Sequence, residues 1–414
     1  MNSIINNKKI QQLLEITFKI GLLLYSIVSV NSFTYATPII SIILWPTVLL
    51  GGLLLCWRLF KLKEYARMPL LIWLSLMTIS FAVSVLLNKD FGLKKNIIII
   101  VLWFFYFFLV YTRDKNETEQ SLIKELQLFS NIFLAYMFIS VFISFVLMAV
   151  GYSNVYTTYD NYEIASGFIW GRLWGVFNDP NAAATMSALA VLLGIHSFLT
   201  ASKRSLKVYY GVNIVLQISY IAFSDSRSGL IALGVGTGIF IFLGRLKAYE
   251  KIKGYSKYLK IILITLASMI FIMAIPKIII WGYNNLDRVT ESSEKEPPKE
   301  VKRGYDLEEN ISNRRFDLWK SGIEIFQTTP VVGTSYSGIT DYAKENLPDT
   351  YLVNNDYKEF KHLDNEFLNV LVSQGIIGAL ILLILIFNCA VYILKRIFKV
   401  SGTDFVIIQT LLSG

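Results

Sequence analysis

The sequence is poor in cysteine and histidine, with two of each in 414 residues. Cys56 and Cys389 both lie inside apolar stretches, so we interpret them as small core residues and expect no disulfide framework. His196 also lies in an apolar stretch and has no Cys, Asp or Glu at helical spacing, which argues against a metal site. Walker A, GxSxG, HExxH and dinucleotide-binding motifs are lacking. We therefore expect no metal and no cofactor.

Acidic residues are scarce in the apolar stretches, and these stretches dominate the sequence. Hydrophobic residues make up 54% of the chain and fall into blocks. A block of about 20 residues crosses a hydrocarbon core of about 30 Å as a helix. The sequence therefore predicts an all-α polytopic membrane protein with ten or eleven transmembrane helices. The predicted spans are 13–30, 37–57, 69–88, 96–112, 129–151, 182–200, 208–223, 229–243, 259–283 and 376–394, with 404–412 as a truncated eleventh.

The formal net charge of +9 invites a nucleic-acid interpretation, but the distribution of Lys and Arg argues against it. Positive residues gather between alternate spans and are few in the short segments that intervene. The positive-inside rule then places the N-terminus in the cytoplasm of a multi-pass cell-membrane protein, and the first span is read as retained rather than cleaved. The excess of positive charge also attracts anionic lipid headgroups. The positive segments are 8–9, 58–67, 113–124, 203–207, 245–260 and 395–399.

One long segment, 284–363, separates the ninth and tenth predicted spans and is expected outside the cytoplasm. Its first part, 291–309, is rich in charge and proline and is expected to be a flexible tether or lid. Residues 314–333 have helical spacing of apolar side chains, and 364–374 predict a short amphipathic helix that leads through Gly375 into the last span. Because no internal repeat or composition break stands out, residues 1–414 are predicted to form a single membrane domain.

Two outer segments could bind a ligand. In 171–181, Pro180 after Asn178 and Asp179 predicts a capped helix start, whose open N–H groups, with Arg172 and Asn181, suit an anion or sugar hydroxyls. A capped helix terminus without a ligand explains the same pattern. In 224–229, Arg227 stands among serines before a helix, which suits a phosphate, although an arginine that extends to the headgroups explains it equally well.

Two further candidates flank the long loop. Arg314 and Arg315 open the helix at 314–333, and because adjacent helical residues point to different faces, at most one is expected to face a site. His362, Asp364 and Asn365 lie just before the last amphipathic helix. Here an imidazole or a carboxylate can take a proton from a sugar hydroxyl, and the alternative is a loop histidine at a wet interface.

These segments, in this order, resemble the O-antigen ligase/polymerase family of bacterial envelope glycosyltransferases. G-V-F-N-D-P-N-A-A-A (175–184), S-D-S-R-S-G-L (224–230), R-F-D-L-W (315–319) with P-V-V-G (330–333), and D-N-E-F-L-N-V-L-V-S-Q-G-I-I-G (364–378) each resemble a family stretch. The sequence departs from the family pattern at two positions. Asp364 stands where the family has its base histidine, and Ser335 replaces the second glycine of the Pro-x-x-Gly-x-Gly turn.

The resemblance implies metal-independent transfer of a glycan from a polyprenyl diphosphate to an acceptor sugar at the outer face. By position, Arg227 and Arg315 would hold the diphosphate, and either His362 or Asp364 would be the base. The leading interpretation is a polymerase of repeat units for a capsule or O-antigen, acting on a growing glycan among membrane lipids, with a flippase and a chain-length regulator as partners. The alternatives are a ligase that transfers finished glycan to a lipid or protein, and a transporter of polysaccharide or lipid carrier.

The predicted topology can be tested with a cysteine at position 292. Because Ser292 falls in the loop expected outside the cytoplasm, a Ser292→Cys variant should react with a membrane-impermeant thiol reagent in intact cells. A cysteine at Ser205, in a segment expected inside, serves as the matched control and should react only after permeabilisation. The reverse pattern would overturn the topology.

Overall fold

The computed structural model describes residues 2–35, 37–61, 68–157, 163–249, 255–290, 314–355 and 360–397. The chain divides into two compact units, each assembled from segments that are far apart in the sequence. Unit 1 comprises 1–19, 48–118 and 305–395, and unit 2 comprises 20–47, 119–304 and 396–414. The first two boundaries between the units fall within helices, at 19/20 and 47/48. The division therefore follows no linker and no change in composition near the N-terminus.

All ten predicted spans that fall in the described part of the chain are helical, which confirms an all-α polytopic membrane fold. Nine described helices are long and apolar enough to cross a membrane, and Leu71–Leu87 is a shorter apolar helix. The helices are α1 (Asn2–Val28), α2 (Ser32–Tyr35), α3 (Ile39–Phe60), α4 (Leu71–Leu87), α5 (Leu93–Phe104) with the π-helix η2 (Phe105–Val110), α6 (Glu119–Ala149), α7 (Pro180–Thr200), α8 (Arg204–Phe223), α9 (Arg227–Ala248), α10 (Ser256–Thr290), α12 (Arg315–Thr328), α13 (Ile339–Asn346) and α14 (Glu366–Ile397).

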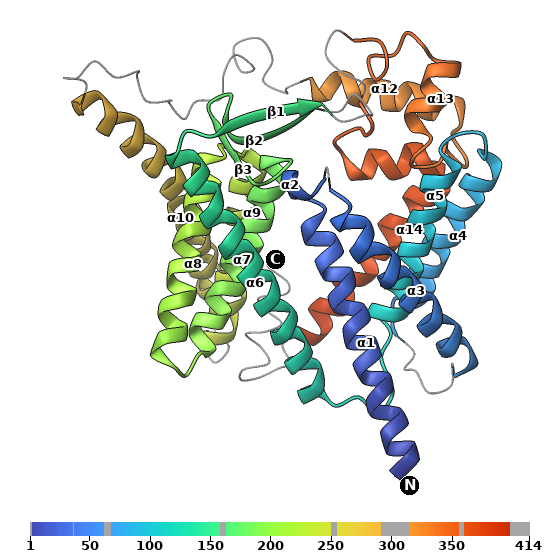
Figure 1. Ribbon diagram of the computed structural model, residues 1–414, viewed down its shortest axis with the longest axis horizontal. Helices are drawn as coiled ribbons and strands as arrows, with labels where there is room; N and C mark the ends of the chain where they lie inside the picture. The colour runs from blue at the N-terminus through green and yellow to red at the C-terminus, as the bar shows by residue number, and fades with distance from the viewer. Residues whose placement is uncertain are drawn as a thin grey trace. The chain divides into compact units, whose positions relative to one another are not determined.

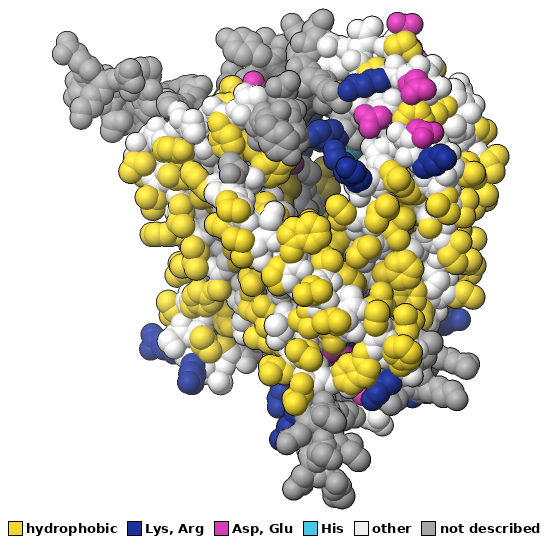
Figure 2. All heavy atoms as spheres, turned by 45° about the vertical axis from the view of Figure 1, so that its right-hand side comes forward, with side chains coloured by type: hydrophobic (Ala, Val, Ile, Leu, Met, Phe, Trp, Pro, Cys, Tyr) yellow, Lys and Arg dark blue, Asp and Glu magenta, His cyan; other side chains and the backbone are white. Residues whose placement is uncertain are grey.

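Hydrophobic side chains cover the sides of the helices, and Lys and Arg side chains gather at helix ends (Figure 2). Many large apolar residues of the spans are exposed, among them Trp45, Leu49 and Phe387. In water such surfaces would drive aggregation, whereas lipid chains solvate them. The exposure pattern therefore fits a protein surrounded by a bilayer.

Unit 2 is built around α7, which packs against both α8 and α9, and α9 packs in turn against α10 (Figure 1). A sheet absent from the sequence prediction lies at one end of these helices. Its antiparallel strands are β1 (Ser153–Thr157), β2 (Glu163–Ile169) and β3 (Arg172–Gly175), in the order β1-β2-β3. Gly175 has a positive φ, and a Cβ there would overlap the Ser144 side chain of α6. β3 therefore packs closely against α6.

Unit 1 carries α12 and α13, which lie in the long loop and pack around a small core of their own (Figure 1). The core is apolar and fully buried, so the outer part of the loop is a folded element. It consists of Leu318, Ile325, Ile339, Ala343, Leu352, Leu363 and Val372. The predicted helix at 314–333 is thus confirmed as α12. The predicted tether at 291–309 and the predicted span at 404–412 lie outside the described residues.

The amphipathic helix predicted before the last span is confirmed, and Gly375 separates it from the span within α14. Gly375 has non-helical torsions, with φ 64° and ψ −165°. The break leaves backbone groups without helical partners, and the turn after α12 supplies partners: Ile376 N–H donates to the Pro330 carbonyl at 2.9 Å. A backbone polar group left unpaired away from water would cost several kcal/mol, of order 2–7.

The same turn approaches α14 through Gly333, which has a positive φ of 70°. A Cβ on Gly333 would overlap the backbone of Ser373 and Gln374, and one on Gly375 would overlap the backbone of Val331. Both glycines are therefore required because two backbones touch at these points.

Ser335, which also follows this turn, is hydrogen-bonded to Ser84 of α4, Asn96 of α5 and Ser373 of α14. Its N–H donates to the Ser373 carbonyl at 2.9 Å, and its hydroxyl accepts from Asn96 Nδ2 at 3.0 Å. Ser84 Oγ of α4 donates to the Ser373 carbonyl at 2.6 Å. Ser335 and Asn96 are fully buried, and Ser335 has a φ of 68°, a left-handed conformation that costs a non-glycine residue about 1–2 kcal/mol. The hydrogen bond to Asn96 thus offsets the conformational strain of a serine at a position where the resemblance leads one to expect glycine.

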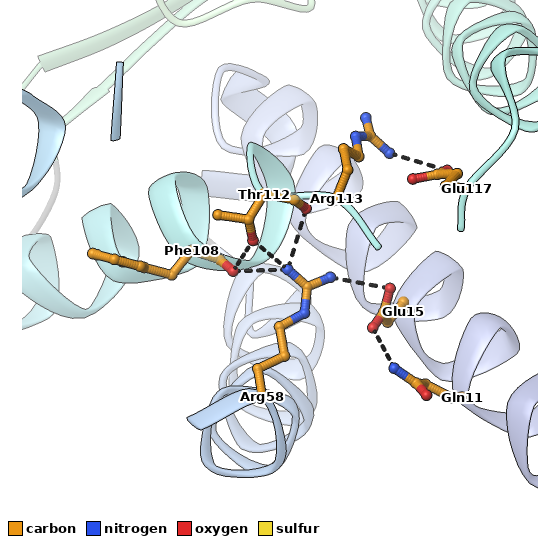
Figure 3. A network of polar contacts seen from close by, with 7 residues as sticks. All are labelled: Gln11, Glu15, Arg58, Phe108, Thr112, Arg113 and Glu117. Carbon is orange, nitrogen blue, oxygen red and sulfur yellow. Dashed lines mark hydrogen bonds and ion pairs between the residues drawn. The ribbon is translucent and has the colours of Figure 1, made fainter. Parts of the chain in front are cut away.

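At the other end of unit 1, Arg58 of α3 joins three helices (Figure 3). Its guanidinium lies 3.0 Å from the Glu15 carboxylate of α1 and donates to the Phe108 carbonyl at 2.7 Å. It also donates to the Thr112 hydroxyl at 2.7 Å. Glu15 falls inside the first predicted span, where an unpaired carboxylate is expensive. The ion pair explains how an acidic residue is tolerated there.

The hydrogen bonds of Ser335 predict how substitutions at this position change the free energy of unfolding. Ser335→Ala keeps the left-handed strain and leaves buried Asn96 with a weakened set of partners, so it should cost about 1–3 kcal/mol. Ser335→Gly loses the same hydrogen bond but relieves the strain, so its free energy of unfolding should exceed that of Ser335→Ala by about 1 kcal/mol. Thermal unfolding of the purified protein in detergent measures the order. A Gly variant less stable than the Ala variant would contradict this account.

Candidate functional site

The predicted site residues fall into two groups, one in each unit. Unit 1 holds the last two motifs, and unit 2 holds the first two. Each group is described by itself. The unit 1 residues are Arg314, Arg315, His362, Asp364 and Asn365, and the unit 2 residues are Arg172, Asn178, Asn181 and Arg227.

In unit 1 the loop before α14 is fixed by Leu363. Its side chain is fully buried against α12, where a Cβ on Gly322 would lie 2.7 Å from Leu363 Cδ1. Trp319 Nε1 donates to the Leu363 carbonyl at 3.1 Å, and the Leu363 N–H donates to Asn369 Oδ1 at 3.0 Å. With this residue anchored inward, its neighbours on either side, His362 and Asp364, remain exposed.

His362 lies beside the phenol ring of Tyr336, with ring centroids 5.3 Å apart and the planes tilted by 31°. Desolvation by the surrounding protein lowers the pKa of His362 below its usual 6.5, while the carboxylates of Glu366 and Asp364 partly oppose this shift. At neutral pH the imidazole is therefore neutral and can accept a proton. Burial, together with Glu366, raises the pKa of Tyr336 to about 12, so its hydroxyl stays protonated.

Asp364 faces Arg315, the predicted diphosphate-binding residue at the start of α12. The Arg315 Nε and Asp364 Oδ2 atoms lie 3.9 Å apart, and both side chains are about half exposed. A pair this exposed contributes at most about 1 kcal/mol to stability, so it can open to admit an anion. Asp364 also has a φ of 51°, a conformation that costs a non-glycine residue energy and is enriched at functional positions.

The remaining unit 1 candidates hold helix ends. Asn365 Oδ1 accepts from the Leu368 N–H at 3.2 Å and so caps α14. Arg314 precedes α12 with a φ of 63°, half-buried, while Arg315 is exposed. The two adjacent arginines therefore lie in different environments because Arg314 precedes the helix in a left-handed conformation.

In unit 2 the predicted capped helix start is confirmed. Asp179 is the N-cap of α7, its carboxylate accepts from the Asn181 N–H at 2.8 Å, and Pro180 occupies the first turn. Asn178 ties this turn to the end of α1, because its Nδ2 donates to the Ser29 carbonyl at 3.2 Å.

Arg172 of β3 organises the polar residues at this end of unit 2. It is buried, its Nε donates to the Ser224 carbonyl at 2.7 Å, and its Nη2 donates to Asn181 Oδ1 at 2.8 Å. The same Asn181 oxygen accepts from Ser226 Oγ at 3.1 Å. The structure thus brings the first two motifs together through Asn181. The Arg172 guanidinium therefore donates to Ser224 and Asn181 of the protein itself. The Asn181 side-chain NH₂ can still donate to a bound ligand.

Arg227 begins α9 next to this cluster and is exposed. The Ser226 hydroxyl caps the helix by accepting from the Gly229 N–H at 3.2 Å. The preceding Asp225 has a φ of 43°, and its carboxylate lies 3.6 Å from Lys277 Nζ of α10. This ion pair accounts for a lysine inside a predicted span. Cationic side chains and a helix N-terminus at one place suit an anion.

Two residues escaped the sequence reasoning. Tyr336 contacts His362 from a turn that precedes it by 26 positions, and Glu366 acts on the His362 pKa from the first turn of α14. The sequence signal for Glu366 was its place inside the 364–378 stretch, and Tyr336 had none. Among the described residues no three His, Cys, Asp or Glu side chains come together in a way that could hold a metal ion.

Comparison with known proteins agrees with the predicted resemblance. Residues 212–383 match the family described as O-antigen ligase, which confirms the resemblance. The match covers Arg227, Arg315, His362 and Asp364, and the 175–184 stretch lies outside it. A protein of Haemophilus influenzae described only as uncharacterized is 22% identical over 217 residues, which is 52% of this chain and 51% of that protein. The chain therefore spans about half the length of the curated relative that it matches.

The state of His362 can be measured directly because the sequence has only two histidines. In an NMR titration of histidine-labelled protein, the His362 imidazole should titrate with a midpoint below 6.5. Glu366→Gln removes a carboxylate that raises the pKa and should shift the midpoint down. Lys361→Gln removes a charge that lowers it and should shift the midpoint up. A His196→Leu variant assigns the signals, and a midpoint above 6.5 would refute the neutral imidazole.

Proposed function

We propose that the chain is a metal-independent membrane glycosyltransferase that joins oligosaccharide repeat units carried on polyprenyl diphosphate into a surface polysaccharide of capsule or O-antigen type. The family match supports a membrane enzyme of glycan transfer, and the site in unit 1 supports the finer assignment. The observation that carries it is the loop anchored by Leu363, on which His362 stands on one side and Asp364, on the other side, lies 3.9 Å from the Arg315 guanidinium of α12.

The transfer needs a base for the acceptor and a stabiliser for the leaving group. The acceptor hydroxyl attacks the anomeric carbon of the donor, and His362 takes the hydroxyl proton as the new glycosidic bond forms. The bond from the anomeric carbon to the diphosphate oxygen breaks, and its electron pair leaves with the polyprenyl diphosphate. A positioned base of suitable pKa contributes about 10²–10⁴-fold to such a step.

His362 is a better candidate for the base than Asp364, although Asp364 holds the family's position. The Asp364 carboxylate is already engaged by Arg315, whose Nε lies 3.9 Å from Asp364 Oδ2. The pKa of His362 is lowered, chiefly by desolvation, so its imidazole can accept a proton at neutral pH. We therefore assign proton transfer to His362 and control of Arg315 to Asp364.

Arg315 supplies positive charge for the diphosphate. A planar guanidinium binds phosphate oxygens in a bidentate manner, and it stabilises the negative charge that develops on the leaving group. Because its ion pair with Asp364 is long and exposed, exchange of the carboxylate for a diphosphate costs little. Arg314, one position earlier, strengthens the local positive potential.

For unit 2 we propose that Arg227 binds a phosphate group as well, with the capped start of α9 and the Asn181 amide beside it. Arg172 acts through Asn181 as a positioning residue, because its donors are directed to Asn181 and Ser224. Asn178 holds the turn that carries Asp179 and Pro180.

The reaction is placed at the outer face of the cell membrane, following the positive-inside rule. The partners are then the lipid-linked oligosaccharide, the growing glycan, membrane lipids, a flippase that delivers the donor and a chain-length regulator. The family description, O-antigen ligase, favours one alternative: transfer of a finished glycan to a lipid or protein acceptor.

A deletion strain complemented with variants tests the proposal. The strain without the chain should carry single-unit surface glycans, and the wild-type gene should restore long polymer. His362→Ala and Arg315→Ala should fail to restore it, whereas Asp364→Asn should retain most of the activity. Gel profiles of surface glycan measure the outcome.

The controls lie on the same elements. Lys320→Ala removes a cation from the exposed face of α12 and should restore polymer fully. Arg227→Ala tests unit 2 separately and should also abolish lengthening. Accumulation of lipid-linked polymer in the deletion strain would show a ligase instead of a polymerase. Full-length polymer with His362→Ala would remove this residue from the mechanism.

A further inference from the structure

Unit 2 contains a cavity at the lysine-rich end of its helices, away from the polar cluster around Asn181. Its volume is about 200 Å³, and α6, α7 and α8 line it. The lining combines apolar side chains with hydroxyls, amides and one imidazole, and contains no charged residue. The residues are Ile123, Leu126, Gln127, Ser130, Asn131, Leu193, His196, Ser197, Thr200, Ala201, Leu206 and Tyr210.

His196 is the feature that marks this cavity as a site. The residue is only 9% exposed, and its Nδ1 atom is buried without a hydrogen-bond partner among the described residues. Native proteins rarely leave a buried polar atom unpaired. The imidazole lines the cavity, so rotation of the ring presents this nitrogen to a group that enters.

The depth of the cavity suits a lipid rather than a soluble molecule. Its α6 lining, 123–131, mostly precedes the predicted span 129–151, whereas its α7 lining, 193–200, falls at the end of the predicted span 182–200. The cavity therefore straddles the predicted boundary between the polar interface and the hydrocarbon layer. An occupant must therefore combine a polar part with an apolar one.

Charge at the mouth selects an anionic lipid. Lys203 and Lys207 lie on the side of α8 that carries Tyr210, and Lys124 lies on the side of α6 that carries Gln127 and Asn131, as helical spacing dictates. All three lysines are exposed. Glu119, one turn further out on α6, opposes only part of this charge.

We propose that this cavity binds one anionic phospholipid of the leaflet that faces the lysine-rich helix ends. The lysines contact the phosphate, Ser197, Gln127 and the His196 imidazole face the glycerol and ester groups, and Leu193 and Leu206 contact the acyl chains. A hydroxyl, an amide NH₂ and an imidazole N–H donate hydrogen bonds, which matches ester carbonyl oxygens that can only accept. The site is independent of the proposed transfer reaction.

Native mass spectrometry of the purified full chain in detergent tests the site. With added phosphatidylglycerol, one lipid per chain should remain bound at concentrations at which phosphatidylcholine and glycerol 3-phosphate dissociate. The double variant Lys203→Gln/Lys207→Gln should weaken phosphatidylglycerol binding about thirtyfold, because each lysine near an anionic headgroup contributes about a factor of five. His196→Leu should weaken it about five- to tenfold.

Arg204→Gln is the matched control, since Arg204 lies at the same helix end on the side of α8 away from the cavity. It should leave the affinity within about twofold. If His196→Leu does not give a monodisperse protein, the double variant Ser197→Ala/Gln127→Leu replaces it with the same expectation. Unchanged binding in these cavity variants would overturn the site and indicate surface attraction alone. Equal affinity for phosphatidylcholine, or for glycerol 3-phosphate, would also overturn it.

Discussion

The contact between two backbones in unit 1, at Gly333 and Gly375, is the constraint on which the arrangement of the outer loop depends. A helix that breaks near the membrane must find partners for the backbone groups it releases, and here the Pro330 carbonyl and the Ser335 N–H provide them. Only glycine permits this approach, because a Cβ at either position would overlap the opposite backbone. The folded loop is thereby attached to the start of the last span, and Ser84 and Asn96 of α4 and α5 reinforce the attachment.

The chemistry follows from this attachment. Once α12 is held against the amphipathic part of α14, the short segment just before α14 buries Leu363, and the two neighbours of this residue are exposed. His362 then meets Tyr336, and Asp364 meets Arg315. Desolvation lowers the pKa of the His362 imidazole, whereas Asp364 forms an ion pair with Arg315. Two residues so close in sequence therefore have different surroundings because the loop that carries them is fixed.

Much of this was predictable from the sequence. Apolar block length predicted every described span, Asp179-Pro180 predicted the start of α7, and Gly375 predicted the break in α14. The sheet β1–β3 was missed because its strands are short and one of them, β1, is mostly exposed, so no alternation of buried residues shows. The buried Arg58–Glu15 pair was missed because partners 43 positions apart leave no local pattern. The roles of Tyr336 and Asn96 depend likewise on contacts between distant segments, which single-sequence periodicity cannot show.

The central claim is that His362 and Arg315 serve one transfer from a polyprenyl diphosphate. The most direct measurement is reconstitution of the purified chain in proteoliposomes with a synthetic polyprenyl-diphosphate oligosaccharide, counting glycosidic bonds formed and polyprenyl diphosphate released. The account predicts one diphosphate released for each bond formed, without added divalent metal, and a loss of about 10²–10⁴-fold in rate for His362→Ala. Release without bond formation, or a rate unchanged in His362→Ala, would contradict it.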